Sequence, residues 1–97
     1  MNKYELLYKH SNPNIVYDNA KNLYTFFNLD MSTRQDKKYM IRSPETDYKW
    51  VHFGSIDYED YTKHHDRDRR DNFRRRNARW KNANINTPAY LSYHLLW

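Results

Sequence analysis

The spacing of apolar residues changes along the chain and divides it into segments. Between Ile15 and Asn28 apolar residues recur at roughly helical intervals behind Asn14, which predicts a short helix capped by Asn14. The preceding residues, 1–14, mix Tyr and Leu with a polar turn, and the polar segment 30–37 is typical of a loop. We therefore expect residues 1–37 to form an N-terminal arm with a short helix.

Residues 38–53 carry the strongest strand pattern. Two runs rich in Tyr, Trp, Ile and Val flank Ser43-Pro44-Glu45-Thr46-Asp47, and a five-residue connection with an early proline suits a β-hairpin. Gly54, the only glycine, closes the second strand, so we expect a positive φ there, which other residues avoid.

A helix is predicted from Arg67 to Lys81, with Asp66 as its N-cap. Its apolar positions are chiefly Phe73 and Trp80, seven residues apart. Such a narrow seam can dock on the hairpin but cannot support the helix alone.

The C-terminal segment, residues 87–97, becomes apolar after Pro88 and ends in Leu-Leu-Trp97. We expect it to fold back and complete the core, the alternative being an exposed docking site for another protein. The predicted fold class is therefore α+β. It is a single small domain at residues 38–97, with a hairpin packed against one Arg-rich helix and the C-terminal segment, plus the arm.

Composition supports one small domain with an aromatic core. Leu, Ile, Val and Phe are scarce in the 97 residues, but 10 Tyr and 3 Trp can replace aliphatic side chains in a core. The absence of Cys excludes disulfides and Cys-based zinc sites. No apolar stretch reaches membrane-spanning length, so we expect no membrane span.

The net charge of +5 is concentrated in one segment. Residues 1–62 carry 8 basic and 9 acidic side chains, whereas residues 63–97 carry 9 basic and 3 acidic ones. The three acids can pair with Arg along the helix, but exposed pairs are worth only about 0.3–0.5 kcal/mol and cannot neutralise nine bases. We predict that a negatively charged partner binds two Arg ridges that face away from the seam, together with Lys81. The predicted partner-binding residues are Arg67, Arg70, Arg74, Arg75, Arg79 and Lys81.

Histidines and carboxylates before this helix raise the question of a metal or acid–base site. The residues concerned are His52, Asp60, His64, His65 and Asp66, whose spacing matches no established metal motif. The favoured interpretation is structural: His64 packs on the hairpin, and the carboxylates pair with Arg or cap the helix.

One glycine also permits no Gly-rich phosphate loop, and no nucleophile stands beside an evident base. We therefore expect neither an enzyme nor a cofactor, and we assign structural roles to seven residues. They are His52, Gly54, His64, Asp66, Phe73, Trp80 and Trp97.

Three motifs carry a resemblance to a known family. They are Trp50-Val51-His52-Phe53-Gly54, the linker Tyr58-Glu59-Asp60-Tyr61-Thr62-Lys63-His64 with Asp66 and the Arg-rich helix, and the C-terminal Leu91-Ser92 and Leu95-Leu96-Trp97. Over roughly residues 38–97 the chain resembles small proteins of large double-stranded DNA viruses of the phycodnavirus, mimivirus and marseillevirus type. The resemblance implies a viral origin and a place in or around the virion, and in the host cytoplasm or viral factory during infection.

Two functions follow as hypotheses. The first is a minor capsid or internal virion protein that cements other virion proteins with acidic surfaces through its Arg-rich helix, aromatic surface and arm. The second is a nucleic-acid-binding protein that contacts DNA or RNA phosphates through the same Arg residues, in genome packaging or viral transcription. The aromatic arm and the modest net charge favour the first.

Overall fold

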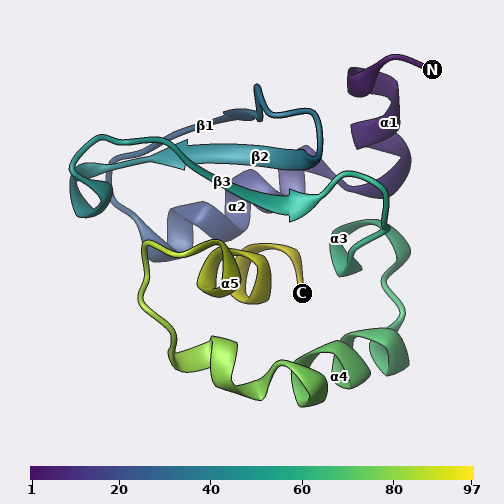
Figure 1. Ribbon diagram of the computed structural model, residues 1–97. Coiled ribbons are helices and arrows are strands. Elements are labelled where there is room, and N and C mark those ends of the chain that lie inside the picture. The colour runs from purple at the N-terminus through teal and green to yellow at the C-terminus, as the bar shows by residue number, and fades with distance from the viewer.

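Three antiparallel strands form a sheet in the order β1-β2-β3, with helices against one of its faces (Figure 1). The computed structural model describes all residues, 1–97. The strands are β1 (Asn28–Met31), β2 (Lys37–Arg42) and β3 (Val51–Ser55).

The predicted hairpin is confirmed as β2 and β3, which pair from Lys37 opposite Ser55 to Ile41 opposite Val51. The connection is longer than expected and contains the short 3₁₀ helix η1 (Pro44–Thr46). Tyr48, expected on the second strand, lies in this connection with a φ of 57°. β1 was not predicted, since the segment 30–37 reads as a loop; Met31 pairs with Tyr39 of β2.

Alternate residues of the hairpin face the core. Tyr39, Ile41 and Phe53 are buried in one core cluster with Val16, Ala20 and Leu91. Figure 1 shows α2 (Pro13–Leu23) and α5 (Pro88–Leu91) on one side of the sheet. α5 continues directly into the π-helical η3 (Ser92–Leu96). The buried side chains Leu91, Leu95 and Leu96 confirm that the C-terminal segment completes the core. The fold is α+β and forms a single small domain.

The N-terminal arm is a wrong prediction, because residues 1–37 belong to the same core. α1 (Lys3–His10) and α2 are both helical, and four of the 11 buried hydrophobic core residues lie in these 37 residues. They are Leu7, Val16, Ala20 and Tyr24. The cap of α2 is also Asn12 rather than Asn14: Asn12 accepts hydrogen bonds from the backbone N–H groups of Asn14 and Ile15.

The Arg-rich helix is shorter than predicted and does not lie on the hairpin. α4 (Arg67–Arg76) ends where Asn77 leaves the helical conformation, and the 3₁₀ helix η2 (Ala78–Asn82) follows. Figure 1 shows α4 beyond α5, on the side of α5 away from the sheet. No residue of α4 is buried, so the helix borders the domain rather than entering its core.

Gly54 adopts the predicted positive φ, 81°. A Cβ at this position would lie 2.8 Å from Leu96 Cδ1, so the absence of a side chain also admits the C-terminal segment. Every helix is too short or too polar to span a bilayer.

Candidate functional site

The start of α4 is fixed by polar contacts between neighbouring residues. Asp66 is its N-cap, as predicted, and accepts hydrogen bonds from the N–H groups of Asp68 and Arg69 at 3.0 and 3.2 Å. The Asp66 N–H donates in turn to Nδ1 of His64, the last residue of α3 (Tyr61–His64), at 2.9 Å. These bonds join the two helices through a short, defined turn.

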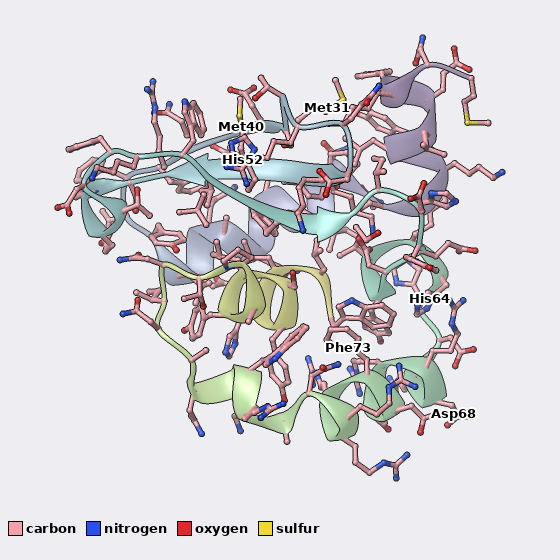
Figure 2. The ribbon with its side chains drawn as sticks, viewed as in Figure 1. Met31, Met40, His52, His64, Asp68 and Phe73 are labelled. Atoms are coloured by element: carbon pink, nitrogen blue, oxygen red, sulfur yellow. The ribbon has the colours of Figure 1, made fainter.

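One stacked pair of aromatic rings connects α4 to the body of the domain. Phe73 lies parallel to Trp97, with ring centroids 4.4 Å apart and an interplanar angle of 8°. The rings of Trp80 and Phe73 meet edge-on with their centroids 5.9 Å apart, and the ring centroids of His64 and Trp97 are 5.2 Å apart. In Figure 2 Phe73 extends from α4 toward the rest of the domain. The sequence-predicted seam therefore exists, but it docks on the C-terminal residue rather than on the hairpin.

The structure divides the predicted partner-binding residues into two groups. Arg67, Arg75, Arg79 and Lys81 are exposed and form no ion pair. Of the ion pairs that the three acids can form with Arg along the helix, one is present: Asp71 Oδ1 lies 3.4 Å from Nε of its neighbour Arg70. Most of the positive charge on this helix is thus uncompensated.

Arg70 and Arg74 do not face away from the domain as expected. Both are half-buried, with Arg70 4.8 Å from the ring centroid of Tyr61 and Arg74 5.6 Å from that of Tyr93. Such cation–π contacts hold the two guanidinium groups against the body. Of the predicted set, these two help to attach α4.

A pocket of about 660 Å³ lies between α4 and the body of the domain. One wall consists of Arg69, Phe73 and Arg76 of α4 with Trp80 of η2. The facing wall comes from the ends of β2 and β3, from α5 and from Trp97. Its charged lining residues are Lys37, Lys38, Arg69, Arg76 and, with opposite sign, Glu59.

Sequence reasoning missed Arg69 and Arg76, which are exposed and line this pocket. In a continuous helix over residues 67–81, as the sequence predicts, positions 69, 73, 76 and 80 would share one face. That pattern could have identified them. Lys37, across the pocket, carries no sequence signal that connects it to α4.

The histidines and carboxylates considered for a metal site are not gathered in the structure. His52 lies on β3, where its Nδ1 is 2.6 Å from Ser32 Oγ, and Asp60 is fully buried elsewhere. No three His, Asp or Glu side chains form a group that could hold a metal ion. His64 packs on Trp97 and Tyr61 rather than on the hairpin as expected.

The environment lowers the pKa of two histidines. For the pKa of His64 the main cause is burial, followed by the positive charge of Arg69. For the pKa of His52 burial again comes first, followed by Arg34 and Lys3. Neutral imidazole is therefore the favoured form of both side chains in the folded protein.

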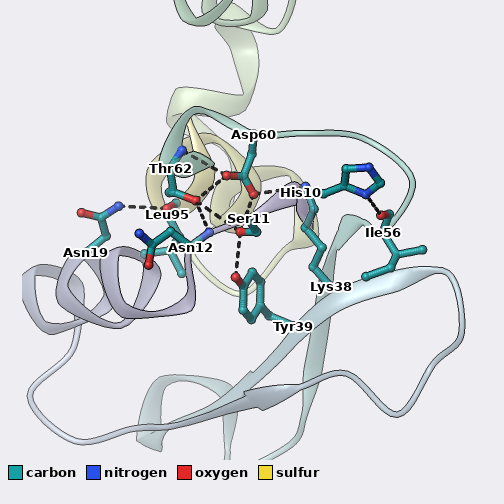
Figure 3. Close-up of polar contacts among 10 residues, drawn as sticks. All are labelled: His10, Ser11, Asn12, Asn19, Lys38, Tyr39, Ile56, Asp60, Thr62 and Leu95. Atoms are coloured by element: carbon teal, nitrogen blue, oxygen red, sulfur yellow. Dashed lines mark hydrogen bonds and ion pairs between the residues drawn. The ribbon is translucent and has the colours of Figure 1, made fainter. Parts of the chain in front are cut away.

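Asp60 belongs to a buried polar network that joins three parts of the chain (Figure 3). Its carboxylate accepts hydrogen bonds from Ser11 Oγ at 2.7 Å, from Lys38 Nζ at 3.1 Å, and from the N–H and hydroxyl of Thr62. Tyr39 donates to Ser11 Oγ at 2.7 Å. Serine, lysine and aspartate together can perform nucleophilic chemistry, but all are buried here, so the network locks α1, β2 and α3 together.

An exposed aromatic patch lies away from α4, on α1, α2 and β1. It consists of Tyr4, Tyr8, Tyr17 and Met31, which surround a smaller pocket of about 250 Å³. The Tyr4 and Tyr8 rings are 4.8 Å apart. Tyrosine and methionine are enriched at protein interfaces, so this patch is a second candidate binding surface.

Comparison with known proteins places the chain in a family. A family model described as "Family of unknown function (DUF5754)" matches residues 27–77, which run from the start of β1 to the end of α4. No curated protein and no solved structure matches the chain. Because the family match covers more than half of the 97 residues, the chain belongs to the DUF5754 family.

Proposed function

We propose that this protein is a binding module that joins two partners in the particle of a large DNA virus, as a minor capsid or internal component. The observation that carries the proposal is the placement of two unlike surfaces. The basic surface comprises the exposed basic residues of α4 and η2, and the aromatic patch lies on α1, α2 and β1 (Figure 1). The residues of the basic surface are Arg67, Arg69, Arg75, Arg76, Arg79 and Lys81.

The two surfaces suit different partners. The basic surface complements an acidic protein face, because its guanidinium groups form bidentate contacts with carboxylates. The aromatic patch suits an uncharged protein face, because tyrosine buries a large area while its hydroxyl stays hydrogen-bonded. A domain with extents of 34 × 33 × 21 Å that carries both can cement two neighbours. The place in a virus rests on the resemblance of residues 38–97 to proteins of such viruses.

The test is incorporation of variants into virus particles. The triple variant Arg67→Glu, Arg75→Glu, Arg79→Glu cancels the positive charge of the six-residue basic surface without touching Phe73. We expect it to fold and to be lost from purified particles. The matched control, Lys9→Glu with Arg34→Glu and Lys49→Glu, changes the net charge equally at exposed positions outside both surfaces and should be retained. Equal incorporation of both variants, or absence of the protein from purified particles, would refute the proposal.

Nucleic acid is the second candidate partner, favoured by the uncompensated guanidinium groups beside an aromatic-lined pocket. A helix of 10 residues presents its side chains over about 15 Å, which spans several phosphates of a strand. Binding to mixed-sequence DNA should then weaken steeply with salt, with a log–log slope of about −0.9 per phosphate contacted on duplex. An absence of binding at about 50 mM salt would exclude this function.

A further inference from the structure

The pocket beneath α4 has an unusual wall for a helix that faces its own domain. Phe73 and Trp80 alternate there with Arg69, Asn72 and Arg76. A helix that packs against a core presents aliphatic residues on this face. Here the face is cationic and aromatic and leaves about 660 Å³ unfilled, a volume typical of pockets for small organic ligands.

The chemistry of the lining defines the kind of occupant. Arg69 and Arg76 on one side and Lys37 on the other supply positive charge, opposed by the carboxylate of Glu59. The side-chain amide of Asn72 can donate through Nδ2, while its Oδ1 already accepts a hydrogen bond from Arg75. Aromatic rings at Phe73 and Trp80 favour a flat, apolar group. The occupant should therefore combine a planar ring with an anion.

We propose that this pocket holds one nucleotide of a single-stranded nucleic acid. The base packs against Trp80, its edge meets Asn72, and its phosphate lies between Arg69 and Arg76. Single strands fit because their bases can be turned out of the chain and stacked on aromatic side chains, whereas bases of a duplex remain enclosed. An acidic peptide would satisfy the cations but would leave the aromatic rings without a planar partner.

The inference rests on nucleic acid as the partner of the basic surface and extends it. The exposed residues Arg67, Arg75 and Arg79 would contact the flanking phosphates. These contacts do not distinguish a single strand from a duplex or from another polyanion. The pocket adds discrimination, because only a strand with accessible bases can enter it. The protein should therefore bind single strands more tightly than duplexes of the same length.

The experiment measures binding of the full chain to fluorescent oligonucleotides, single-stranded and duplex, by anisotropy at about 50 mM salt. Trp80→Ala should weaken single-strand binding about 5- to 150-fold, the range found for loss of one base stack, and leave duplex binding nearly unchanged. The matched control Trp50→Ala removes a half-buried tryptophan whose ring lies beneath Arg42, outside the residues that line the pocket, and should change neither.

Further variants separate the pocket from the fold and from the exposed arginines. Trp80→Phe keeps an aromatic ring and should recover most of the single-strand affinity. The circular dichroism spectrum of Trp80→Ala should match that of the wild type, which shows that its weaker binding is not caused by loss of the fold. Arg69→Ala with Arg76→Ala should reduce the single-strand salt slope by about 0.7, because the two side chains share one phosphate and each phosphate contact on a single strand contributes about 0.7. Arg34→Ala, on an exposed arginine outside α4, is the control.

The outcomes distinguish the two levels of the proposal. Equal affinity for single strands and duplexes, with Trp80→Ala neutral, overturns the nucleotide pocket while binding by the basic surface stands. No binding of either form overturns both. If Trp80→Ala weakens the binding of poly-glutamate but leaves the binding of the oligonucleotide unchanged, the pocket is a peptide site. That result also overturns the nucleotide pocket.

Discussion

Replacing Lys38 with methionine tests the buried network directly, because it removes the cation that pairs with the carboxylate of Asp60. Lys38 is 2% exposed and Asp60 0%, with Nζ and Oδ2 3.1 Å apart. Loss of one partner from a buried ion pair costs about 3–5 kcal/mol, since the remaining charge stays buried without compensation. A domain of this size has about 5–15 kcal/mol of stability, so Lys38→Met removes a large fraction.

The double variant Lys38→Met with Asp60→Asn shows whether the charges act as a pair. Each single variant leaves one charge buried, but the double variant leaves none, so its loss of stability should be smaller than the sum by about 1–3 kcal/mol. Urea unfolding followed by tryptophan fluorescence at pH 7 gives all four free energies of unfolding. Lys21→Met, which breaks the exposed pair with Asp18, is the control and should cost under about 1 kcal/mol.

The pH dependence of Asp60→Asn adds an independent check. Burial lowers the pKa of Lys38, and the charge of Asp60 opposes that effect. Without Asp60 the folded protein favours neutral Lys38 still more strongly, while the unfolded chain keeps the ordinary pKa. Stability of this variant relative to wild type should therefore rise as the pH increases from 7 toward 10. Single losses below about 1 kcal/mol that simply add in the double variant would refute the reasoning.

Three further stability predictions follow from particular side chains. Gly54→Ala should cost about 1–3 kcal/mol in urea unfolding, because a φ of 81° strains any side chain and the new Cβ meets Leu96, whose flexible end can give way; an unchanged midpoint would contradict this. Burial lowers the pKa of His64, so protonation of this side chain is disfavoured in the folded protein, and the free energy of unfolding should fall as the pH drops below 6.5. His64→Asn should therefore lose less Tm than the wild type between pH 7 and 5, and an identical loss would contradict the prediction. Burial raises the pKa of Tyr24 to about 12, so the stability that its neutral phenol provides should be lost between pH 10 and 12, by roughly 2–3 kcal/mol at most, and Tyr24→Phe should remove that part of the alkaline transition.

The predictable parts of the fold are those specified by neighbouring residues. The hairpin β2–β3 follows from two apolar-aromatic runs around a proline-containing turn, and the cap at Asp66 from one carboxylate before a helix. The positive φ of Gly54 follows from the single glycine at the end of a strand. Each needs no knowledge of distant segments.

The arm was mispredicted because its place depends on contacts far along the chain. Leu7 and Val16 stand in short apolar runs within a largely polar sequence, and their burial requires the sheet and the C-terminal segment. Ser11 is buried through its bond to Asp60, 49 residues away. Two polar residues so far apart give no signal in a single sequence, although together they fix how α1 and α2 meet the sheet.

The candidate site shows the same division between local and distant causes. The charge of α4 can be read from the sequence, but the direction of each guanidinium group depends on where the helix docks, which Phe73 and Trp97 decide from 24 residues apart. Docking on Trp97 rather than on the hairpin turns Arg70 and Arg74 toward Tyr61 and Tyr93. It also opens the space that Arg69 and Arg76 line. The stack of Phe73 on Trp97 thus decides both which arginines attach the helix and which remain for a partner. The sequence alone does not distinguish the two groups, because it does not show where Trp97 lies.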